Sequence, residues 1–224
     1  MVGITVGLIV AAGASMVAVR QINEHRRLML EVQIQQDLRV AADLLQQELR
    51  RAGYRGLPAN GVWEPAHGQG TSAVAAKDAM VSPYATLTQT RPGGSDIFYQ
   101  YARIPAGATA PNATNELQPS EKFGFRLSNK TLSIRLGVSD NQENWQPITD
   151  PDSVLIEDFQ VRIQSQQISL EDLCDCTAGS CPTQTVRQVN FTLIGVAKSD
   201  PNLKRTLTVS ERIRADDVSG ACPA

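Results

Sequence analysis

The sequence predicts an α+β protein in which one long N-terminal helix packs on an antiparallel β-sheet. Three observations lead to this fold class. Residues 1–19 carry no charged side chain, no proline or glycine interrupts the chain between Ser15 and Ala52, and six segments with strand-like alternation follow residue 95. Because no second helical period separates those segments, neighbouring strands are expected to run antiparallel.

The composition is that of one folded domain with an appendage. The chain has 224 residues, of which 42% are hydrophobic and 20% charged, so it can bury a core and does not resemble a disordered protein. Its 21 basic and 23 acidic side chains give a pI near 5.7. Such a chain lacks the cationic excess that drives binding to phosphates, so no nucleic-acid partner is expected.

Residues 1–19 form an apolar run that is long enough to cross a membrane. As a helix they would span about 28 Å, close to the thickness of the bilayer hydrocarbon core. A cleaved signal peptide would need a basic region before the apolar run and a small-residue cleavage site after it, and the sequence shows neither. A buried core helix, the other alternative, is usually shorter. We therefore expect residues 1–19 to be a retained transmembrane segment.

Small residues recur at every fourth position of this segment. On a helix this spacing places them on one face, where they allow a second helix to approach closely. Glycine and alanine are also common in membrane helices in general, so an ordinary lipid-facing surface is the alternative. We expect the face to serve helix packing and name it the small-residue face. It consists of Gly3, Gly7, Ala11 and Ser15.

Residues 20–53 continue the helix as an amphipathic segment that ends at Gly53. From residue 1 to residue 52 the helix would be about 78 Å long, more than a globular head can cover, so part of it must protrude. Apolar side chains recur at three-to-four spacing along its later half, as on a helix face that covers a sheet. This head-facing stripe consists of Leu30, Ile34, Leu38, Ala41, Leu45, Leu49 and Ala52.

Residues 54–224 are expected to form one β-rich head. Residues 57–94 are rich in glycine, proline and small residues and show no period, which predicts a long irregular segment. The turn Ser128-Asn129-Lys130 between two alternating runs predicts a hairpin. The six predicted strands cover residues 96–102, 122–127, 131–136, 154–163, 187–196 and 206–213.

All four cysteines, Cys174, Cys176, Cys181 and Cys222, lie in the last quarter of the chain. An even number in loop-like sequence indicates disulfides formed in an oxidising compartment. Cys174 and Cys176 are too close to pair with each other, so each is expected to bond to Cys181 or Cys222. A bond between Cys176 and Cys222 would stabilise the fold by about 4 kcal/mol on the loop-entropy model. A four-thiolate zinc site is the alternative, although the C-x-C-x4-C spacing is unusual for zinc, and free thiols are the third reading.

The sequence contains no pattern that indicates catalysis. His25 and His67 belong to no Cys/His, HExxH or Ser/His/Asp arrangement, and no GxSxG, GxGxxG or phosphate-loop motif occurs. Acidic side chains gather between residues 140 and 152, but their spacing does not match a calcium-binding loop. We therefore expect a non-enzymatic protein without a metal or cofactor.

Two stretches resemble a known family. Residues 1–10, MVGITVGLIV, closely resemble the stretch that follows the processing motif in minor pilins of the PilW family. Residues 43–56, DLLQQELRRAGYRG, are similar to the helix-ending signature of that family and of the minor pseudopilin J of type II secretion. The resemblance covers residues 1–57 and is architectural beyond them, where residues 207–216 are placed like the family's closing strand. It implies a type IV pilin-like fold.

The resemblance also implies a function. A minor pilin of this family would take part in type IV pilus assembly, in a priming or tip complex. Its partners would be other minor and major pilins, the inner-membrane assembly platform and membrane lipid. The protein would cross the inner membrane once with a periplasmic head, and would lie in the pilus or at the cell surface after assembly. A minor pseudopilin of a type II secretion system is the first alternative, and a single-pass periplasmic adhesin or binding module is the second.

The family's leader, its prepilin peptidase site and the glutamate a few residues beyond that site do not occur in this sequence. We therefore expect the chain to begin inside the mature helix, through truncation or a wrongly chosen start methionine. The positive-inside rule would place the side that follows the anchor in the cytoplasm, because three basic residues lie directly after it: Arg20, Arg26 and Arg27. The cysteines indicate the opposite orientation, which we adopt.

Overall fold

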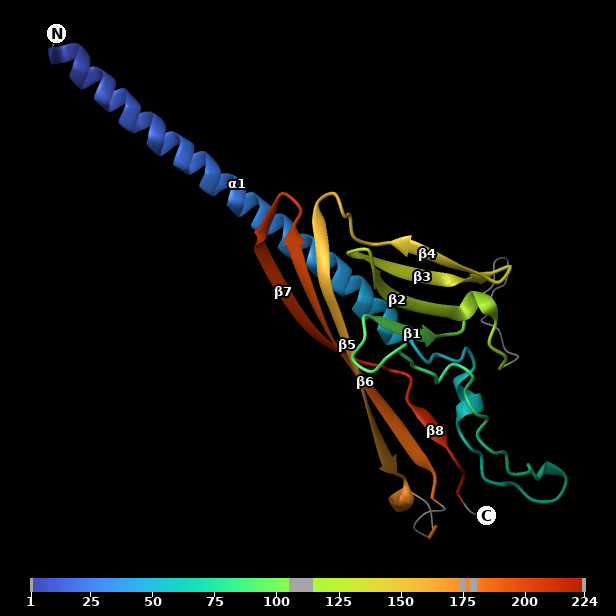
Figure 1. Ribbon diagram of the computed structural model, residues 1–224. Coiled ribbons are helices and arrows are strands. Elements are labelled where there is room, and N and C mark those ends of the chain that lie inside the picture. Colours follow the sequence, from blue (N-terminus) through green and yellow to red (C-terminus); the bar gives the residue numbers. More distant parts are fainter. Residues whose placement is uncertain (1, 105–114, 174–175, 178–180, 223–224) are drawn as a thin grey trace.

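The computed structural model describes residues 2–104, 115–173, 176–177 and 181–222 (Figure 1). A long helix leads into a head built from antiparallel strands, so the expected α+β class is confirmed. The elements in chain order are α1 (Val2–Arg51), η1 (Pro58–Gly61), η2 (Gly70–Ser72), β1 (Asp96–Gln100), η3 (Pro119–Glu121), β2 (Lys122–Ser128), β3 (Thr131–Ser139), β4 (Gln142–Pro147), β5 (Val154–Ser169), η4 (Glu171–Leu173), β6 (Thr183–Ala197), β7 (Asp200–Arg212) and β8 (Asp217–Ser219).

Helix α1 ends where the sequence predicts, because Gly53 adopts a conformation that other residues rarely take. Its φ is +82°, in the left-handed region that ends many helices. The Gly53 N–H donates to the Gln100 carbonyl at 2.8 Å, and the Ala102 N–H donates to the Tyr54 carbonyl at 2.7 Å. A Cβ on Gly53 would lie 3.1 Å from the Cβ of Ala215. The end of the helix is therefore fixed both to the end of β1 and to the C-terminal part of the chain.

The strands divide into two sheets, whereas the sequence suggested one. The first has the order β1-β2-β3-β4, and the second has the order β5-β6-β7, with β8 paired to β6. β7 and β8 lie one after the other along the same edge of β6. Strand β5 approaches the first sheet through single backbone hydrogen bonds, from Ile156 to Lys130 (2.8 Å) and from Val161 to Gly94 (3.2 Å). Isolated contacts of this kind do not make a ladder, so the two sheets remain separate.

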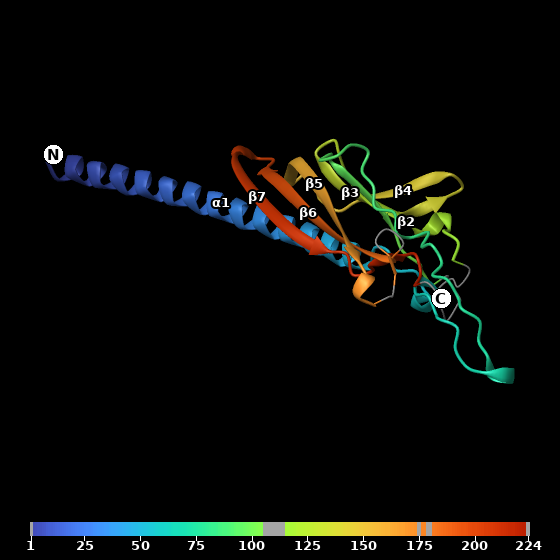
Figure 2. The same ribbon diagram turned by 90° about the horizontal axis from the view of Figure 1, so that it is seen from below.

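The core lies between the second half of α1 and the two sheets (Figures 1 and 2). Six of the seven residues of the head-facing stripe are buried, and Leu30 is half-buried against the same core. The helix passes close to β6 because Gly195 has no side chain: a Cβ there would lie 3.0 Å from Cδ2 of Leu38. On the first sheet, the ring of Tyr99 lies 5.9 Å from that of Phe125. The stripe thus covers the sheets as its spacing requires.

The predicted hairpin around Asn129 is confirmed. Strands β2 and β3 pair antiparallel with Ser128 opposite Thr131, which leaves Asn129 and Lys130 as a two-residue turn. Both turn residues have positive φ, +50° and +61°. This is the turn geometry whose twist matches that of the flanking strands.

Strand β4 was not predicted, because its sequence QENWQP has a single apolar residue and no alternation. A second two-residue turn with positive φ, at Asp140 and Asn141, connects it to β3. Trp145 holds the strand in place: its ring lies 3.9 Å from Cζ of Arg126 and meets the ring of Phe98 edge-on at 6.3 Å. Pairing with β3 and contacts with side chains of β1 and β2, rather than its own pattern, keep β4 in the sheet.

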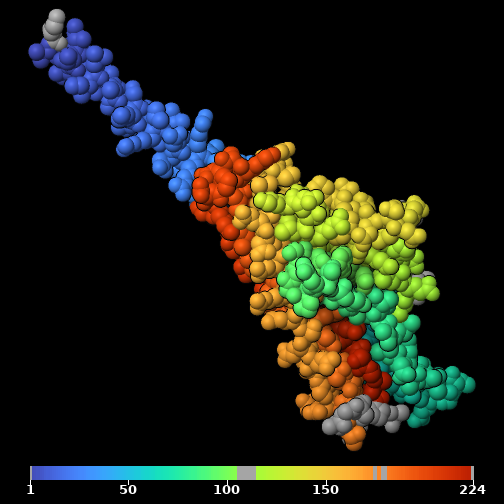
Figure 3. Space-filling model, viewed as in Figure 1, coloured from blue at the N-terminus to red at the C-terminus, as the bar shows by residue number. Residues whose placement is uncertain are grey.

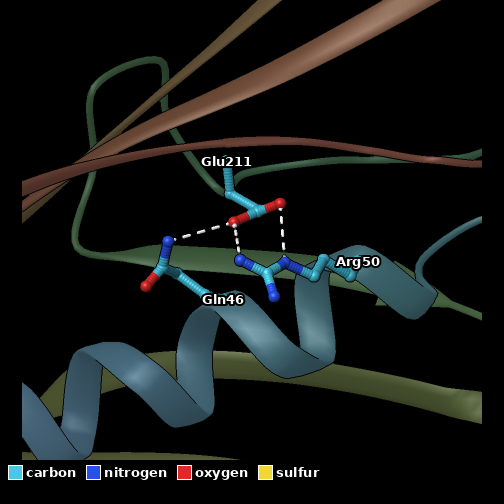
Figure 4. A network of polar contacts seen from close by, with 3 residues as sticks. All are labelled: Gln46, Arg50 and Glu211. Atoms are coloured by element: carbon cyan, nitrogen blue, oxygen red, sulfur yellow. Dashed lines mark hydrogen bonds and ion pairs between the residues drawn. The ribbon is translucent and has the colours of Figure 1, made fainter.

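Polar contacts join the last turns of α1 to β7 (Figure 4). Glu211 of β7 accepts two hydrogen bonds from the guanidinium of Arg50, from Nε to Oε1 at 2.9 Å and from Nη2 to Oε2 at 3.0 Å. It also accepts one from Nε2 of Gln46 at 3.0 Å. This two-pronged geometry fixes the helix against β7 in one orientation.

Candidate assembly surface

The first half of α1 projects from the head (Figure 3), and its residues 2–19 carry no charged side chain. Residues 2–29 are all exposed, and Val2, Ile4 and Ile9 keep 78%, 71% and 72% of their surface. By length and composition α1 is able to span a membrane. An apolar surface of this extent is buried in water-soluble proteins, so lipid or another protein must cover it.

The small-residue face is open along this projecting half. Nothing lies within 4 Å of the place where a Cβ on Gly3 or Gly7 would stand. The Ser15 hydroxyl donates to the Ala11 carbonyl at 2.9 Å, so its polar group is satisfied within the helix. At about 100° per residue the same face includes two further alanines. These are Ala14 and Ala18, which extend the face into a smooth strip along which the backbone of another helix can approach closely.

A polar segment separates the apolar half from the head. Residues 20–27 are exposed and include three arginines and a glutamate. The head begins at Glu31, which pairs with Arg205 of β7. This ion pair and the pair between Arg50 and Glu211 hold the two ends of the head-covering half of α1 to one strand. Because Arg205 and Glu211 both belong to β7, the two ion pairs hold the head in a fixed orientation relative to the helix.

The sulfur atoms of Cys176 and Cys181 are joined in a disulfide. Cys222 is also disulfide-bonded, and Cys174 lies outside the described residues. The bond between Cys176 and Cys222 considered from the sequence is therefore not formed. The bonded pair is separated by only 5 residues, so it closes a small loop between η4 and β6 and stabilises the fold by less than a long loop would.

Both histidines are exposed, and Nδ1 of His67 lies 3.8 Å from Oε1 of Glu64. His25 is exposed on α1, and Nδ1 of His67 lies 3.1 Å from the Pro65 carbonyl. Within the part of the chain that the structure describes, no group of three or more His, Cys, Asp or Glu residues is placed to hold a metal ion. Glu143 instead accepts a hydrogen bond from Nε1 of Trp145 at 2.8 Å and pairs with Arg135 at 2.6 Å, and both contacts lower its pKa.

Glu48 is a buried carboxylate that sequence reasoning missed. It is only 8% exposed although it lies on the apolar side of α1, one turn after Leu45. Its Oε2 accepts a hydrogen bond from the Tyr101 hydroxyl at 2.9 Å, and its Oε1 accepts one from Nη1 of Arg51 at 3.0 Å. Burial, followed by the charge of Glu48, raises the pKa of Tyr101. A lone acidic residue inside an apolar stripe was the available signal, because such a position requires a partner.

A comparison with protein-family models matches residues 27–213 of this chain to prepilin peptidase-dependent protein B. The matched range contains the head-covering half of α1 and strands β1 to β7, whereas β8 lies beyond it. Comparisons with curated proteins and with solved structures find no match. Since most of the chain is matched and its single apolar N-terminal helix provides a membrane anchor, the chain belongs to the prepilin peptidase-dependent protein B family and is a type IV pilin-related protein with a pilus- or pseudopilus-related role.

Proposed function

We propose that this protein is a minor pilin of the PilW type that takes part in type IV pilus assembly as a structural, non-enzymatic subunit of a priming or tip complex. The observation that carries the proposal is the exposed half of α1 with its open small-residue face. The family match and the resemblance of residues 1–10 and 43–56 to minor pilins support it.

The geometry suggests how such a subunit assembles. Before assembly, lipid covers the apolar residues 2–19. During assembly, a helix of another pilin replaces lipid along the small-residue face, where the backbones approach closely enough for dense packing. The two ion pairs to β7 transmit the position of the helix to the head. Docking at the helix therefore fixes where the head lies in the complex.

The proposed partners are other minor and major pilins, the inner-membrane assembly platform and membrane lipid. We place the head in the periplasm, and at the pilus or cell surface after assembly. The disulfide between Cys176 and Cys181 supports this side of the membrane, because such bonds form and persist in oxidising compartments.

The proposal is tested by two leucine substitutions of the same kind. Gly7→Leu adds bulk to the small-residue face, whereas Gly13→Leu makes the same change on the other side of the helix, where the space around the residue is equally open. Each variant is expressed behind the family's leader in a strain whose own copy is deleted, and surface pili and secreted proteins are measured. Gly7→Leu is expected to reduce piliation strongly and Gly13→Leu to restore it.

Other outcomes of the deletion experiment would support one of the two alternative functions. If the deletion leaves pili intact but abolishes secretion of type II substrates, the protein is a pseudopilin. If the deletion strain has normal pili and normal secretion, the filament role is wrong and a periplasmic binding module takes its place. Membrane levels of each variant, measured by immunoblot, separate lost assembly from lost protein.

A further inference from the structure

A cavity of about 900 Å³ lies where the end of α1 meets the irregular segment 57–94 and the C-terminal residues 214–218. Its volume is within the range of ligand-binding pockets. Two aspartates, Asp216 and Asp217, are the acidic residues of its lining. The chain as a whole is slightly acidic, so this cavity concentrates positive charge, with six arginines around it: Arg50, Arg51, Arg55, Arg103, Arg187 and Arg214.

Arg187 of β6 is the most buried of these arginines, with 8% of its surface exposed. Its guanidinium donates to two main-chain carbonyls, those of Ala85 and Ala215, and its Nε has no hydrogen-bond partner among the described residues. Burial lowers its pKa, and the charges of Asp217 and Asp216 oppose that shift without a hydrogen bond to it. A buried cation without a bonded carboxylate is costly, so an anion in the cavity would be stabilised there.

Arg55, which follows the end of α1, is a second arginine of the lining and is half-buried. Its Nη2 donates to the Met80 carbonyl at 2.8 Å and to Oδ1 of Asn115 at 3.1 Å, while its Nε is buried without a partner in the described chain. Burial lowers its pKa as well. The guanidinium lies over Gly61, where an added Cβ would overlap Nη1. The backbone at Gly61 thus makes room for the Arg55 guanidinium.

Two further arginines are exposed and take part in no ion pair with a described residue. They are Arg103, which follows β1, and Arg214, which follows β7. By contrast, Arg50 and Arg51 are paired with Glu211 and Glu48. Four of the six guanidinium groups at the cavity therefore form no ion pair with a described residue, and the charge of Asp217 only partly offsets those of Arg187 and Arg55.

The remaining lining is largely apolar and includes Tyr101, Ala102, Ile104, Val62 and Val218. A guanidinium fork matches the two oxygens of a carboxylate, and apolar walls favour a ligand whose charged group is attached to a hydrophobic body. We propose that this cavity binds a carboxylate joined to an apolar body, supplied by the C-terminal end of a protein or by a free organic acid. The site lies in the head and is independent of the assembly role assigned to the projecting helix.

Binding is measured by calorimetry on the full chain in non-ionic detergent with two matched pairs of probes. The first pair is 4-phenylbutyrate and its amide, and the second is the peptide Ala-Leu-Phe with a free or an amidated C-terminus. Inorganic phosphate is the third probe. We expect each carboxylate to bind about tenfold or more tightly than its amide, the difference that about 1.4 kcal/mol of charge-assisted hydrogen bonding produces. Tighter binding of the peptide acid assigns the site to a protein chain end, and tighter binding of phenylbutyrate assigns it to a free acid.

The double variant Arg103→Gln and Arg214→Gln tests the site by removing two exposed charges that form no ion pair with a described residue. Because Cζ of Arg103 also lies 5.7 Å from the ring of Phe123, the melting temperature of the variant is measured alongside. It should weaken carboxylate binding about tenfold or more. The matched control is Arg162→Gln, an exposed arginine of β5 that does not line the cavity. The proposal would be overturned if acid and amide bound equally tightly, or if phosphate bound as tightly as the carboxylate probes. It would also be overturned if the double variant bound the carboxylates as tightly as the unchanged protein. Piliation plays no part in these readouts, so failure here leaves the assembly role untouched.

Discussion

The Tyr101 hydroxyl donates a 2.9 Å hydrogen bond to Oε2 of Glu48, and this contact ties α1 to the residue that follows β1 inside the core. Replacing Tyr101 by Phe removes a bond to a buried carboxylate, and such bonds contribute about 1.5–3 kcal/mol. The melting temperature should fall by about 4–10 °C in a protein of this size. Tyr54→Phe is the control, because that hydroxyl bonds a main-chain carbonyl from an exposed ring. Equally small decreases in melting temperature in both variants would show that the hydrogen bond between Tyr101 and Glu48 does not stabilise the fold.

The same cluster predicts a loss of stability in alkali. Burial, and then the charge of Glu48, raises the pKa of Tyr99 and Tyr101 above the ordinary value of 10.0. Because the unfolded chain releases these protons first, their contribution is fully present below about pH 10 and decreases as the pH rises beyond it. Melting temperatures measured from pH 8 to pH 11 should drop steeply above pH 10. A double variant with Tyr99→Phe and Tyr101→Phe should show a flatter profile, and an unchanged profile would contradict the assignment.

The stripe of α1 predicts a large effect from one truncation. Leu45 is fully buried between the helix and the sheets, so Leu45→Ala leaves a cavity and should cost about 2–5 kcal/mol. Val40, 62% exposed on the same helix, provides the control, and Val40→Ala should change stability by less than about 0.5 kcal/mol. Thermal unfolding in non-ionic detergent measures both. Similar losses in the two variants would mean that the helix does not lie on the head as described.

The packing at the end of α1 predicts that alanine substitution of two glycines destabilises the protein to different extents. Gly53→Ala forces a side chain into a left-handed conformation and places its Cβ 3.1 Å from that of Ala215. Gly93 also has positive φ, +70°, but nothing lies within 4 Å of an added Cβ. Gly93→Ala should therefore cost about 1 kcal/mol from the backbone alone, and Gly53→Ala clearly more. Urea unfolding curves of the two variants would show equal midpoints if the helix end were not packed against Ala215.

Local patterns in the sequence were sufficient for the helix and for the turns that depend on nearby residues. The end of α1 follows from Gly53, and the hairpin at Asn129 follows from the alternation on either side of it. Strand β4 could not be predicted, because Trp145 is held by Arg126 and Phe98, which are distant in the sequence. Likewise, alternation within a strand does not reveal which sheet it joins, so the division into two sheets was not predicted.

The arginine-lined cavity had no local signal either. Its guanidinium groups come from α1, the residues directly after α1, the residues after β1, β6 and the residues after β7. Only folding brings these segments together. Arg187 belonged to a correctly predicted strand, yet its burial depends on the carbonyls of Ala85 and Ala215, which no spacing in the sequence indicates. Sites assembled from distant segments lie beyond what periodicity and motifs predict.

The central claim is that the small-residue face of α1 contacts another pilin helix, and site-specific photo-crosslinking tests it most directly. The photoreactive residue p-benzoylphenylalanine is placed at Ser15, on one edge of that face, or at Met16, at the same depth but turned about 100° away from it. Both positions are exposed on the isolated chain. Irradiation of cells that express all pilus components should give a covalent adduct with another pilin from Ser15 and little or none from Met16. Equal adducts from both positions, or adducts from neither, would contradict the claim.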